Sequence, residues 1–268
     1  MKNIDDAPAT KDNKMQAANS LSYFGGKGSD GTFQTIINQI PKHDLFIETH
    51  AGLARITEHL DNINGITILN DISSHTCKML EAKFKERIIP SSLLFDLISP
   101  ECIKEKFVAC HGKVIIENMD AIDLLEKYKP LLEVMKTVIF SDPPYPLDSR
   151  KSNRERYEFE MTDSQHYELI HYLKKVSCFI IICTYPNMIY ETEFSSWRNI
   201  HYYSNTRKGM ALEYLFLNFD TPWYLQTIKF YGKDFRERER YKKIKKNLES
   251  KLKSIPKPIL NHILYEFS

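Results

Sequence analysis

The chain has 268 residues, of which 42% are hydrophobic and 27% charged, proportions typical of a globular protein. No apolar run is long enough to cross a bilayer, so no transmembrane helix is expected, and the polar N-terminal segment lacks the apolar core of a secretory signal. The five cysteines form no C-x-x-C pair, which argues against a zinc site or a disulfide framework. We therefore expect a reduced, cytoplasmic protein with no membrane contact and no metal, with a flexible leader at residues 1–20.

The net charge of +2 is unevenly distributed along the chain. Between Lys229 and Lys253, eleven Lys and Arg residues stand against four acids, so this segment carries +7 and the remaining chain −5. A basic tail on a mildly acidic body favours a polyanion as partner. We accordingly expect a main domain at residues 21–228 and a basic helical extension at residues 229–268.

In chain order, the first motif reads Tyr-Phe-Gly-Gly-Lys at residues 23–27, where two glycines let the backbone approach a ligand beside an aromatic ring and a cation. A helical pattern follows up to Ile40. Apolar strands are then expected at residues 44–48, 66–71, 113–117 and 136–141, alternating with helical patterns such as that at residues 73–87. This alternation predicts an α/β fold with a mostly parallel sheet flanked by helices.

An acidic residue lies at or just beyond the end of each of these strands: Glu48, Asp71, Asp120 and Asp142. The carboxyl ends of parallel strands meet at one edge of a sheet, so we expect the four acids to converge there. The turn after Glu48 passes through Gly52 into a helix, and Asp71 ends the next strand, where a ribose-binding carboxylate is expected in such a unit. The G-x-G-x-x-G spacing of dinucleotide binders is absent, so NAD and FAD are not favoured.

The fourth strand leads into the sequence Asp142, Pro143, Pro144, Tyr145. Each proline lacks an N–H and fixes its own φ, so the turn is stiff and its carbonyl oxygens stay free to accept hydrogen bonds. The Asp adds a carboxylate and the Tyr adds a flat aromatic face. Such a shelf suits a planar group that carries an NH2, such as the edge of a nucleobase. A proline-rich turn that only closes the strand is the alternative.

The following loop, residues 146–161, is basic, and its charge fits contacts with phosphates, with a solvated loop as the alternative. Further strands are expected at residues 178–185, 199–203 and 211–219, with a basic hairpin loop before the last. The cations that we expect to contact nucleic acid are Arg150, Lys151, Arg154, Arg156, Arg207 and Lys208.

The tail predicts a charged helix at residues 234–253 with one apolar stripe, followed by a short helix after Pro258. The stripe could dock on the body or on a second subunit, which would give a homodimer through this helix, while the basic face could lie along DNA. A solvated charged helix is the alternative.

Together, these motifs resemble the Dam-type (DPPY) family of DNA adenine methyltransferases, particularly its small phage and mobile-element members. Residues 23–27 are similar to the family's aromatic-x-Gly-Gly-Lys motif, residues 46–52 to its F-x-E-P-F-x-G motif, and residues 70–71 to its N-D pair. Residues 142–145 match the D-P-P-Y motif, the most specific of the set, and residues 213–218 resemble the late E-x-L-x-x-N strand. The resemblance implies a Rossmann-like methyltransferase that uses S-adenosylmethionine and acts on double-stranded DNA, in a bacterial or phage-infected cell and in settings such as restriction–modification.

The resemblance assigns catalysis to Asp142, Pro143, Pro144 and Tyr145. It assigns the binding of S-adenosylmethionine to Tyr23, Phe24, Gly25, Gly26, Lys27, Glu48, Ala51, Gly52, Asp71, Ile72, Asp120, Ala121 and Asp142. Within this set Lys27 would neutralise the cofactor carboxylate, Asp71 would hold the ribose hydroxyls, and Asp120 would meet the cofactor adenine.

In the implied reaction, Asp142 and the Pro143 carbonyl would each accept one N–H of the amine of a flipped adenine, on which Tyr145 would stack. Two departures stand out: Thr49-His50 replaces the usual Pro-Phe, and no large recognition domain fits between the third and fourth strands. Recognition of the DNA target sequence would then depend on residues 88–112, residues 146–161 or the tail. Methylation of RNA adenine or of glutamine, and a DNA-binding homologue that has lost catalysis, remain the alternatives.

Overall fold

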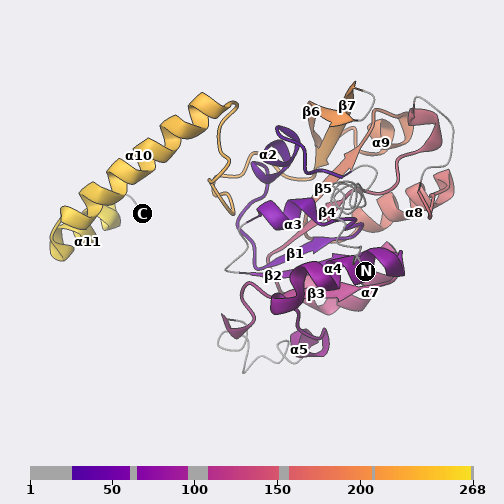
Figure 1. Cartoon of the computed structure of the whole chain (residues 1–268), viewed down its shortest axis with the longest axis horizontal. Coiled ribbons are helices and arrows are strands. Elements are labelled where there is room, and N and C mark those ends of the chain that lie inside the picture. Colours follow the sequence, from indigo (N-terminus) through magenta and orange to yellow (C-terminus); the bar gives the residue numbers. More distant parts are fainter. Residues whose placement is uncertain (1–25, 61–64, 96–107, 151–156, 207–208, 267–268) are drawn as a thin grey trace, which may run out of the picture.

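The computed structural model describes residues 26–60, 65–95, 108–150, 157–206 and 209–266. One seven-stranded sheet organises the body, with the strand order β3-β2-β1-β4-β5-β7-β6 (Figure 1). Its strands are β1 (Leu45–Glu48), β2 (Ile66–Asn70), β3 (Val114–Glu117), β4 (Thr137–Ser141), β5 (Phe179–Thr184), β6 (Arg198–Thr206) and β7 (Gly209–Leu217). The first five strands pair in parallel, and β7 lies antiparallel between β5 and β6.

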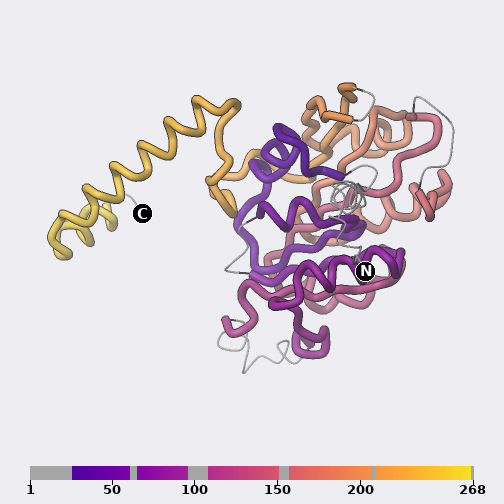
Figure 2. Tube along the Cα trace, in the orientation of Figure 1, coloured from indigo at the N-terminus to yellow at the C-terminus, as the bar shows by residue number. Residues whose placement is uncertain are grey.

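Helices cover both faces of this sheet (Figure 1, Figure 2). The helices of the body are α2 (Thr32–Ile37), α3 (Arg55–His59), α4 (Ser74–Phe84), α5 (Ser92–Phe95), α7 (Ala121–Leu132), α8 (Asp163–Leu173) and α9 (Met188–Glu193), with short 3-10 turns at η1 (Lys85–Arg87) and η2 (Leu147–Ser149). Side chains of α2, α3 and α4 pack on one face, and those of α5, α7, α8 and α9 on the other.

The inner strands owe their position to short, mainly apolar sequences. Every residue of β1, β2 and β4 is buried, because a parallel strand covered on both faces has no solvent side. Alternate side chains serve the two cores: Ile47 and Ile139 face the α7–α8 side, and Phe46 and Val138 face the α2–α3 side. Each such fully buried side chain stabilises the fold by roughly 1.5–3 kcal/mol.

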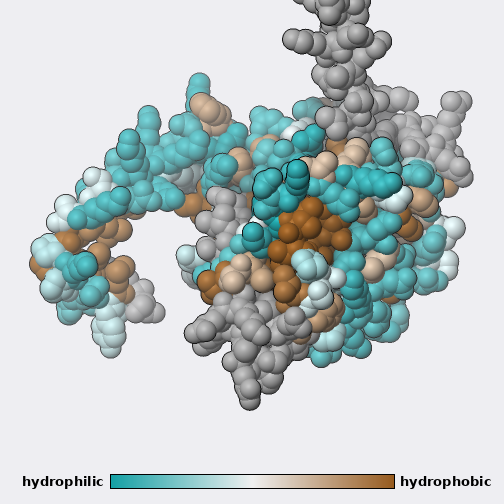
Figure 3. Space-filling view, turned by 60° about the horizontal axis from the view of Figure 1, so that its bottom comes forward, coloured by the Kyte–Doolittle hydropathy of each residue, from teal (hydrophilic) through white to brown (hydrophobic). Residues whose placement is uncertain are grey.

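The C-terminal segment stands apart from this core as an arm of two helices, α10 (Phe235–Ser254) and α11 (Lys257–Glu266) (Figure 1). Asp234 caps α10, its carboxylate accepting a hydrogen bond from the Glu237 N–H. Neither helix has a buried residue. On the face shown in Figure 3, hydrophobic residues interrupt the hydrophilic surface of the arm. None of the described helices combines the length and the apolar character needed to cross a bilayer.

The expected mixed α/β fold with a mostly parallel sheet flanked by helices is confirmed. Every strand expected from the sequence is present, and most of the observed ends lie within one or two residues of those expected. The largest difference is β6, which extends to Thr206 because it pairs with β7 along its whole length. The capping box at Thr162 and Gln165 begins α8, as the Thr162-Asp163 pair indicates.

Candidate active site

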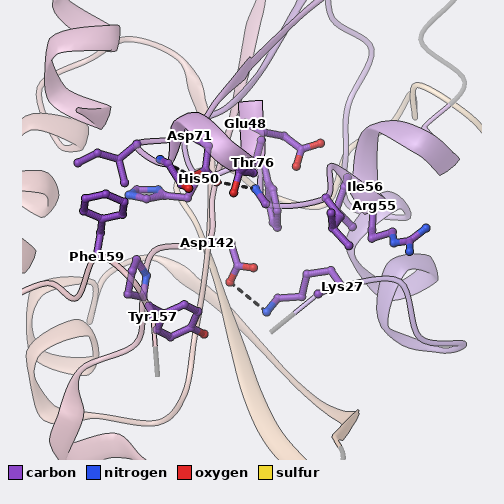
Figure 4. A pocket seen from close by; sticks show the side chains of 18 of the residues that line it. Lys27, Glu48, His50, Arg55, Ile56, Asp71, Thr76, Asp142, Tyr157 and Phe159 are labelled. Atoms are coloured by element: carbon purple, nitrogen blue, oxygen red, sulfur yellow. Dashed lines mark hydrogen bonds and ion pairs between the residues drawn. The ribbon is translucent and has the colours of Figure 1, made fainter. Parts of the chain in front are cut away.

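Two adjoining cavities open at the carboxyl edge of the sheet, with volumes of about 280 and 340 Å³. The first lies among the ends of β1, β2 and β4 and contains Lys27, Asp71 and Asp142 (Figure 4). The second lies over the end of β3 and the start of α7, where Asp120 and Ala121 line it. Both cavities are lined by His50, Ile72, Pro144 and Phe159. The acids that end four different strands therefore face one continuous region.

The turn after β1 is fixed by two buried carboxylates. Glu48 accepts hydrogen bonds from the backbone N–H of Thr57 at 2.9 Å and from its hydroxyl at 2.5 Å, so it closes the first turn of α3. Burial raises the pKa of Glu48 to about 7, although the Thr57 hydrogen bonds act in the opposite direction. Asp71 Oδ2 accepts from the Gly52 N–H at 2.9 Å, and Gly52 has a φ of 50°, a conformation that favours glycine.

Asn70, the last residue of β2, ties together the loops that follow β1 and β3. Its amide donates to the carbonyl oxygens of Thr49 and Met119, and its own carbonyl accepts from the Met119 N–H. Asp120 caps α7 through a 2.7 Å bond between its Oδ1 and the Ile122 N–H. These backbone-directed bonds hold the rim of the second cavity in place.

The two oxygens of the Asp142 carboxylate have different surroundings. Oδ1 lies 3.0 Å from the ammonium of Lys27 and accepts a hydrogen bond from the Tyr145 hydroxyl at 3.0 Å. Among the described residues, Oδ2 has no hydrogen-bond partner, and Asp142 lines the first cavity. Burial, together with the charge of Glu213, raises the pKa of Asp142 to about 6 against the lowering effect of Lys27. Oδ1 is thus held by two partners, and Oδ2 can accept a hydrogen bond from a ligand.

Behind Asp142 lies a buried polar cluster. The Lys27 ammonium donates to the Tyr145 hydroxyl at 2.6 Å and lies 3.4 Å from Glu213 Oε2 (Figure 4 shows Lys27 pointing toward Asp142). Glu213, on β7, accepts further hydrogen bonds from the hydroxyls of Tyr202 at 2.6 Å and Ser204 at 2.5 Å. Although burial opposes its charge, the neighbouring carboxylates raise the pKa of Lys27 well above its usual value, so it stays an ammonium.

The loop beyond the Pro-Pro turn folds back over the first cavity. Arg150 donates through Nε to the carbonyl oxygen of Tyr145 at 2.9 Å and through Nη1 to Glu160 at 2.8 Å. Glu158 accepts a 2.9 Å bond from the hydroxyl of Ser73, next to the end of β2. As a result, Tyr157 and Phe159 line the cavity beside Pro144. Phe140 also lines this cavity.

The structure brings together most of the described residues that the sequence singled out, with the exception of Pro143, Tyr145 and Arg150, which are buried and line neither cavity. Those of the site set that line one or both cavities are Gly26, Lys27, Glu48, Ala51, Gly52, Asp71, Ile72, Asp120, Ala121, Asp142 and Pro144. Several others lie outside the described residues: Tyr23, Phe24, Gly25, Lys151, Arg154, Arg156, Arg207 and Lys208.

Three expected roles change. Tyr145 was expected to offer its ring for stacking, but the side chain is only 4% exposed, packs in the core, and lines neither cavity. Arg150 was expected to contact phosphate, but it is 8% exposed and its guanidinium binds Glu160 and a backbone carbonyl. Lys27 was expected to neutralise a cofactor carboxylate, but it is already paired with two acids of the protein.

Sequence reasoning gave no role to Glu213, His50 or Tyr157. The signal for Glu213 is a single acid inside the apolar strand β7, where a carboxylate must be buried with partners. His50 lines both cavities, and its Nδ1 lies 2.9 Å from the Thr49 hydroxyl. Burial lowers the pKa of His50 to about 4, so the ring is neutral at physiological pH. Within the described residues no cluster of three or more His, Cys, Asp or Glu side chains could hold a metal ion.

No protein-family model matches this chain, and a comparison with curated proteins finds no match. Among solved structures, an O-methyltransferase from Bacillus cereus in complex with SAH is similar at 11% identity and a TM-score of 0.43, over 76% of this chain and 87% of that one. TrmK from M. capricolum, in complex with S-adenosyl-homocysteine, is similar at 10% identity and a TM-score of 0.42, over 89% and 94% of the two chains. A putative methylase from Haemophilus influenzae aligns at 13% identity and a TM-score of 0.36, over 70% and 84%. Similarities of this size do not assign the chain to a family. The chemistry is therefore argued from the residues of the site alone.

Proposed function

We propose that the chain is an S-adenosylmethionine-dependent methyltransferase that modifies the exocyclic amine of adenine in DNA. The observation that carries this proposal is the Asp142 carboxylate, with Oδ1 anchored by Lys27 and Tyr145 and Oδ2 left without a partner among the described residues. No described group donates to the carbonyl oxygen of the adjacent Pro143 either. An NH2 group has two protons, and we assign them to Asp142 Oδ2 on the cavity side and to the carbonyl oxygen of Pro143, a buried residue that does not itself line a cavity.

The cavities fit a nucleoside-type cofactor. Each Asp71 oxygen accepts one backbone N–H, from Gly52 or Ser73, and keeps a second lone pair for a ribose hydroxyl. Ile72 is 47% exposed at the junction of the cavities, where its apolar surface suits a flat ring, and Asp120 stands beside it to accept from an amine. Lys27 is paired with two buried acids, so we assign the carboxylate of the cofactor to Arg55, a second cation that lines the first cavity and whose ion pair with Glu58 is exposed.

In the reaction, the residues of the chain orient the acceptor amine. S-adenosylmethionine, when bound, supplies an activated methyl group, so the protein does not need a covalent intermediate. Adenine's amine is a weak nucleophile because its lone pair is conjugated with the ring. Hydrogen bonds to Asp142 Oδ2 and to the Pro143 carbonyl oxygen would draw the nitrogen toward a tetrahedral geometry and align it for attack on the methyl carbon, which is an orientation and electrostatic effect. As the N–C bond forms, the S–CH3 bond would break with S-adenosylhomocysteine as the leaving group, and the methylated nitrogen would release one proton to solvent.

A base in a duplex cannot reach this turn, so we propose that it is flipped out of the stack. The Tyr145 ring is buried, so we assign the stacking contact to Tyr157 or Phe159, which line the cavity beside Pro144. Stacking on an aromatic ring contributes about 1–3 kcal/mol per base, which offsets part of the cost of unstacking. The basic helix α10 supports a polyanionic substrate, since its nine Lys and Arg residues stand against three Glu.

The test is methyl transfer from labelled S-adenosylmethionine to unmethylated duplex DNA, followed by digestion to nucleosides. We expect label in methyldeoxyadenosine for the wild-type chain. Asp142→Ala should lower turnover at least about 100-fold, because it removes the acceptor that aligns the amine. Calorimetry should find cofactor binding by this variant within a few fold of the wild type.

Asp44 provides a matched control, because it precedes β1 at the opposite edge of the sheet. Asp44→Ala should transfer methyl groups at the wild-type rate. Undiminished transfer by Asp142→Ala would refute the mechanism. Label that appears only in RNA, or only in protein, would show that this class of molecule, and not DNA, is the substrate.

A further inference from the structure

Glu213, on the antiparallel strand β7, contacts the residues that hold Asp142 and does not itself line either cavity. It is 4% exposed and receives hydrogen bonds from two strands: Tyr202 and Ser204 on β6, and the Cys183 thiol at 3.2 Å on β5. Its Oε2 also lies 3.2 Å from the Tyr145 hydroxyl and 3.4 Å from the Lys27 ammonium. Those are the two groups that hold Asp142 Oδ1.

This arrangement fixes one oxygen of Asp142 through a chain of contacts. Without Glu213, the attraction toward β7 would be lost, and the Lys27 ammonium and the Tyr145 hydroxyl could shift toward Asp142 and contact both of its oxygens. With Glu213 present, they are drawn back toward β7 and contact Oδ1 alone. Oδ2 is thereby kept available on the cavity side.

We propose that Glu213 is a positioning residue of the methyl-acceptor site, holding Lys27 and Tyr145 so that Asp142 presents one unoccupied carboxylate oxygen to the substrate amine. This role rests on the proposed function for its catalytic consequence, but the coupling between the two carboxylates is a property of the folded chain itself. No proton transfer is assigned to Glu213.

Asp142 and Glu213 together carry one negative charge more than Lys27 neutralises, and the two carboxylates differ in their pKa. Although burial opposes its charge, Lys27 and the hydroxyl donors lower the pKa of Glu213, whereas burial and the charge of Glu213 raise the pKa of Asp142 to about 6. Asp142 is therefore the member that takes up a proton as the pH falls. When protonated it can no longer accept freely from an amine, so turnover should fall below about pH 6.

Several other titratable groups face Asp142 from the elements packed around it. They are Glu48 on β1, Cys183 on β5, Tyr145 on the same turn, Tyr157 on the loop before α8, Tyr185 after β5 and Tyr190 on α9, besides Lys27 and Glu213. Burial raises the pKa of each of these Cys and Tyr side chains, so they stay neutral below pH 8. Glu48 titrates near pH 7, so Asp142 must be followed individually.

The experiment is a 13C NMR titration of the Asp142 carboxyl in the full chain, assigned by its absence in Asp142→Asn, together with the pH profile of turnover. Glu213→Gln removes the charge and keeps the shape. We expect it to lower the titration midpoint of Asp142, and the acid limb of kcat, by about one pH unit. Plateau kcat should fall by about 100-fold through misalignment, with the KM for S-adenosylmethionine nearly unchanged.

Glu213→Asp distinguishes the effect of the negative charge from the effect of the side-chain length. It keeps the negative charge but is one methylene shorter, so it cannot hold all of its partners at once. We expect an acid limb close to that of the wild type with a reduced plateau. If Glu213→Gln does not fold, Ser204→Ala removes one hydrogen bond and leaves the charge, and should lower kcat without moving the midpoint. An unchanged kcat in Ser204→Ala would then overturn the proposal.

Glu117 supplies a matched control. It is also a buried strand carboxylate paired with a lysine and a tyrosine, at 2.6 Å from both Lys127 and the Tyr128 hydroxyl, but it lines neither cavity. Glu117→Gln should change neither profile. An Asp142 midpoint that is the same in Glu213→Gln and wild type, or an equal loss of turnover in Glu117→Gln, would overturn the proposal. A shifted midpoint without methyl transfer by the wild type would instead overturn the proposed function alone.

Discussion

At the scale of single residues, the surroundings of each carboxylate set its role at the sheet edge. Glu48 accepts two hydrogen bonds from Thr57 and closes a helix, Asp71 ties down the Gly52 turn, and Asp142 keeps one oxygen for a ligand. All three are acids at or next to strand ends, and the sequence pattern alone does not distinguish them. Burial raises the pKa of each one, which makes the edge sensitive to pH.

The first residue-scale prediction concerns Glu48 and the free energy of unfolding. Its pKa is raised from 4.5 to about 7, so between these values the folded state binds more protons than the unfolded state. The contribution of Glu48 to stability is therefore lost as the pH rises through this window, by roughly 3 kcal/mol. Glu48→Gln keeps the acceptor for Thr57 and should be about this much more stable than wild type at pH 8, relative to their difference at pH 4.

Chemical denaturation at a series of pH values measures this difference. Glu58 is the control of opposite sign, because its pKa is lowered, against the effect of partial burial, by Lys83 and Arg55. Glu58→Gln should lose stability relative to wild type as the pH rises, by a small amount since the side chain is exposed. A Glu48→Gln difference that stays constant from pH 4 to pH 8 would contradict the assigned burial effect.

At the scale of elements, Arg150 connects the Pro-Pro turn to the described residues that precede α8. Arg150 contacts the turn that carries Tyr145 on one side and Glu160 on the other, and it is nearly inaccessible. The Pro-Pro turn and the segment that lines the first cavity therefore behave as one structural unit. A basic residue next to the site here serves the fold, although its position suggested a contact with phosphate.

We predict that Arg150→Ala destabilises the protein by about 3 kcal/mol, because it breaks a mostly buried ion pair with Glu160 and removes the donor to the Tyr145 carbonyl oxygen. Arg150→Lys should recover part of this loss, since it restores the charge but not the forked geometry. Urea denaturation measures both. Lys174→Ala is the control, because its ion pair with Glu193 is exposed and should contribute no more than about 1 kcal/mol. A fully stable Arg150→Ala that binds DNA more weakly would restore the phosphate-contact hypothesis.

At the scale of the whole molecule, the basic residues of α10 lie apart from the domain that carries the sheet. The C-terminal arm carries the basic residues of α10 on helices with no buried side chain, while the acids of the site lie at the carboxyl edge of the sheet. The exposed apolar side chains Ile244, Leu248 and Leu252 lie on the same helix. We therefore propose the arm as the surface that a polyanion would contact, because its side chains take no part in the core of the body.

Removal of residues 234–268 should leave the unfolding transition of the body within about 0.5 kcal/mol of wild type, because no core contact is lost. The affinity for duplex DNA should fall and depend less on salt. Neutralising up to six phosphates would contribute up to about 5 to the slope of log K against log salt. Fluorescence anisotropy over a range of salt concentrations measures this slope.

The control for the arm is a full-length variant with Lys242, Lys243, Lys245 and Lys246 changed to Gln, which keeps the helix and its apolar stripe. It should lose a comparable share of the salt dependence. If the truncated chain loses affinity but the Gln variant does not, the apolar stripe is responsible, and sedimentation would then show whether it joins two copies of the chain.

Much of the fold could be predicted from the sequence, because hydrophobic periodicity is local information. Residues 66–70 and 137–141 are buried on both faces, and their sequences are mainly apolar and β-branched. The Asp-Pro-Pro-Tyr turn was likewise recognisable from residue chemistry alone. The order of the strands, and the antiparallel insertion of β7, do not follow from such runs, since pairing depends on contacts between distant segments.

The sequence by itself determined which residue types reach the carboxyl edge of the sheet: Glu48, Asp71, Asp120 and Asp142 follow from strand ends in a parallel fold. Only the tertiary structure decided what each one does. Tyr145 turns its ring into the core, Arg150 is bound by Glu160, and Glu213 arrives from β7, far beyond Asp142 along the chain. The physical reason is that burial and partner distance set the charge and orientation of a polar side chain, and both depend on residues far apart in the sequence.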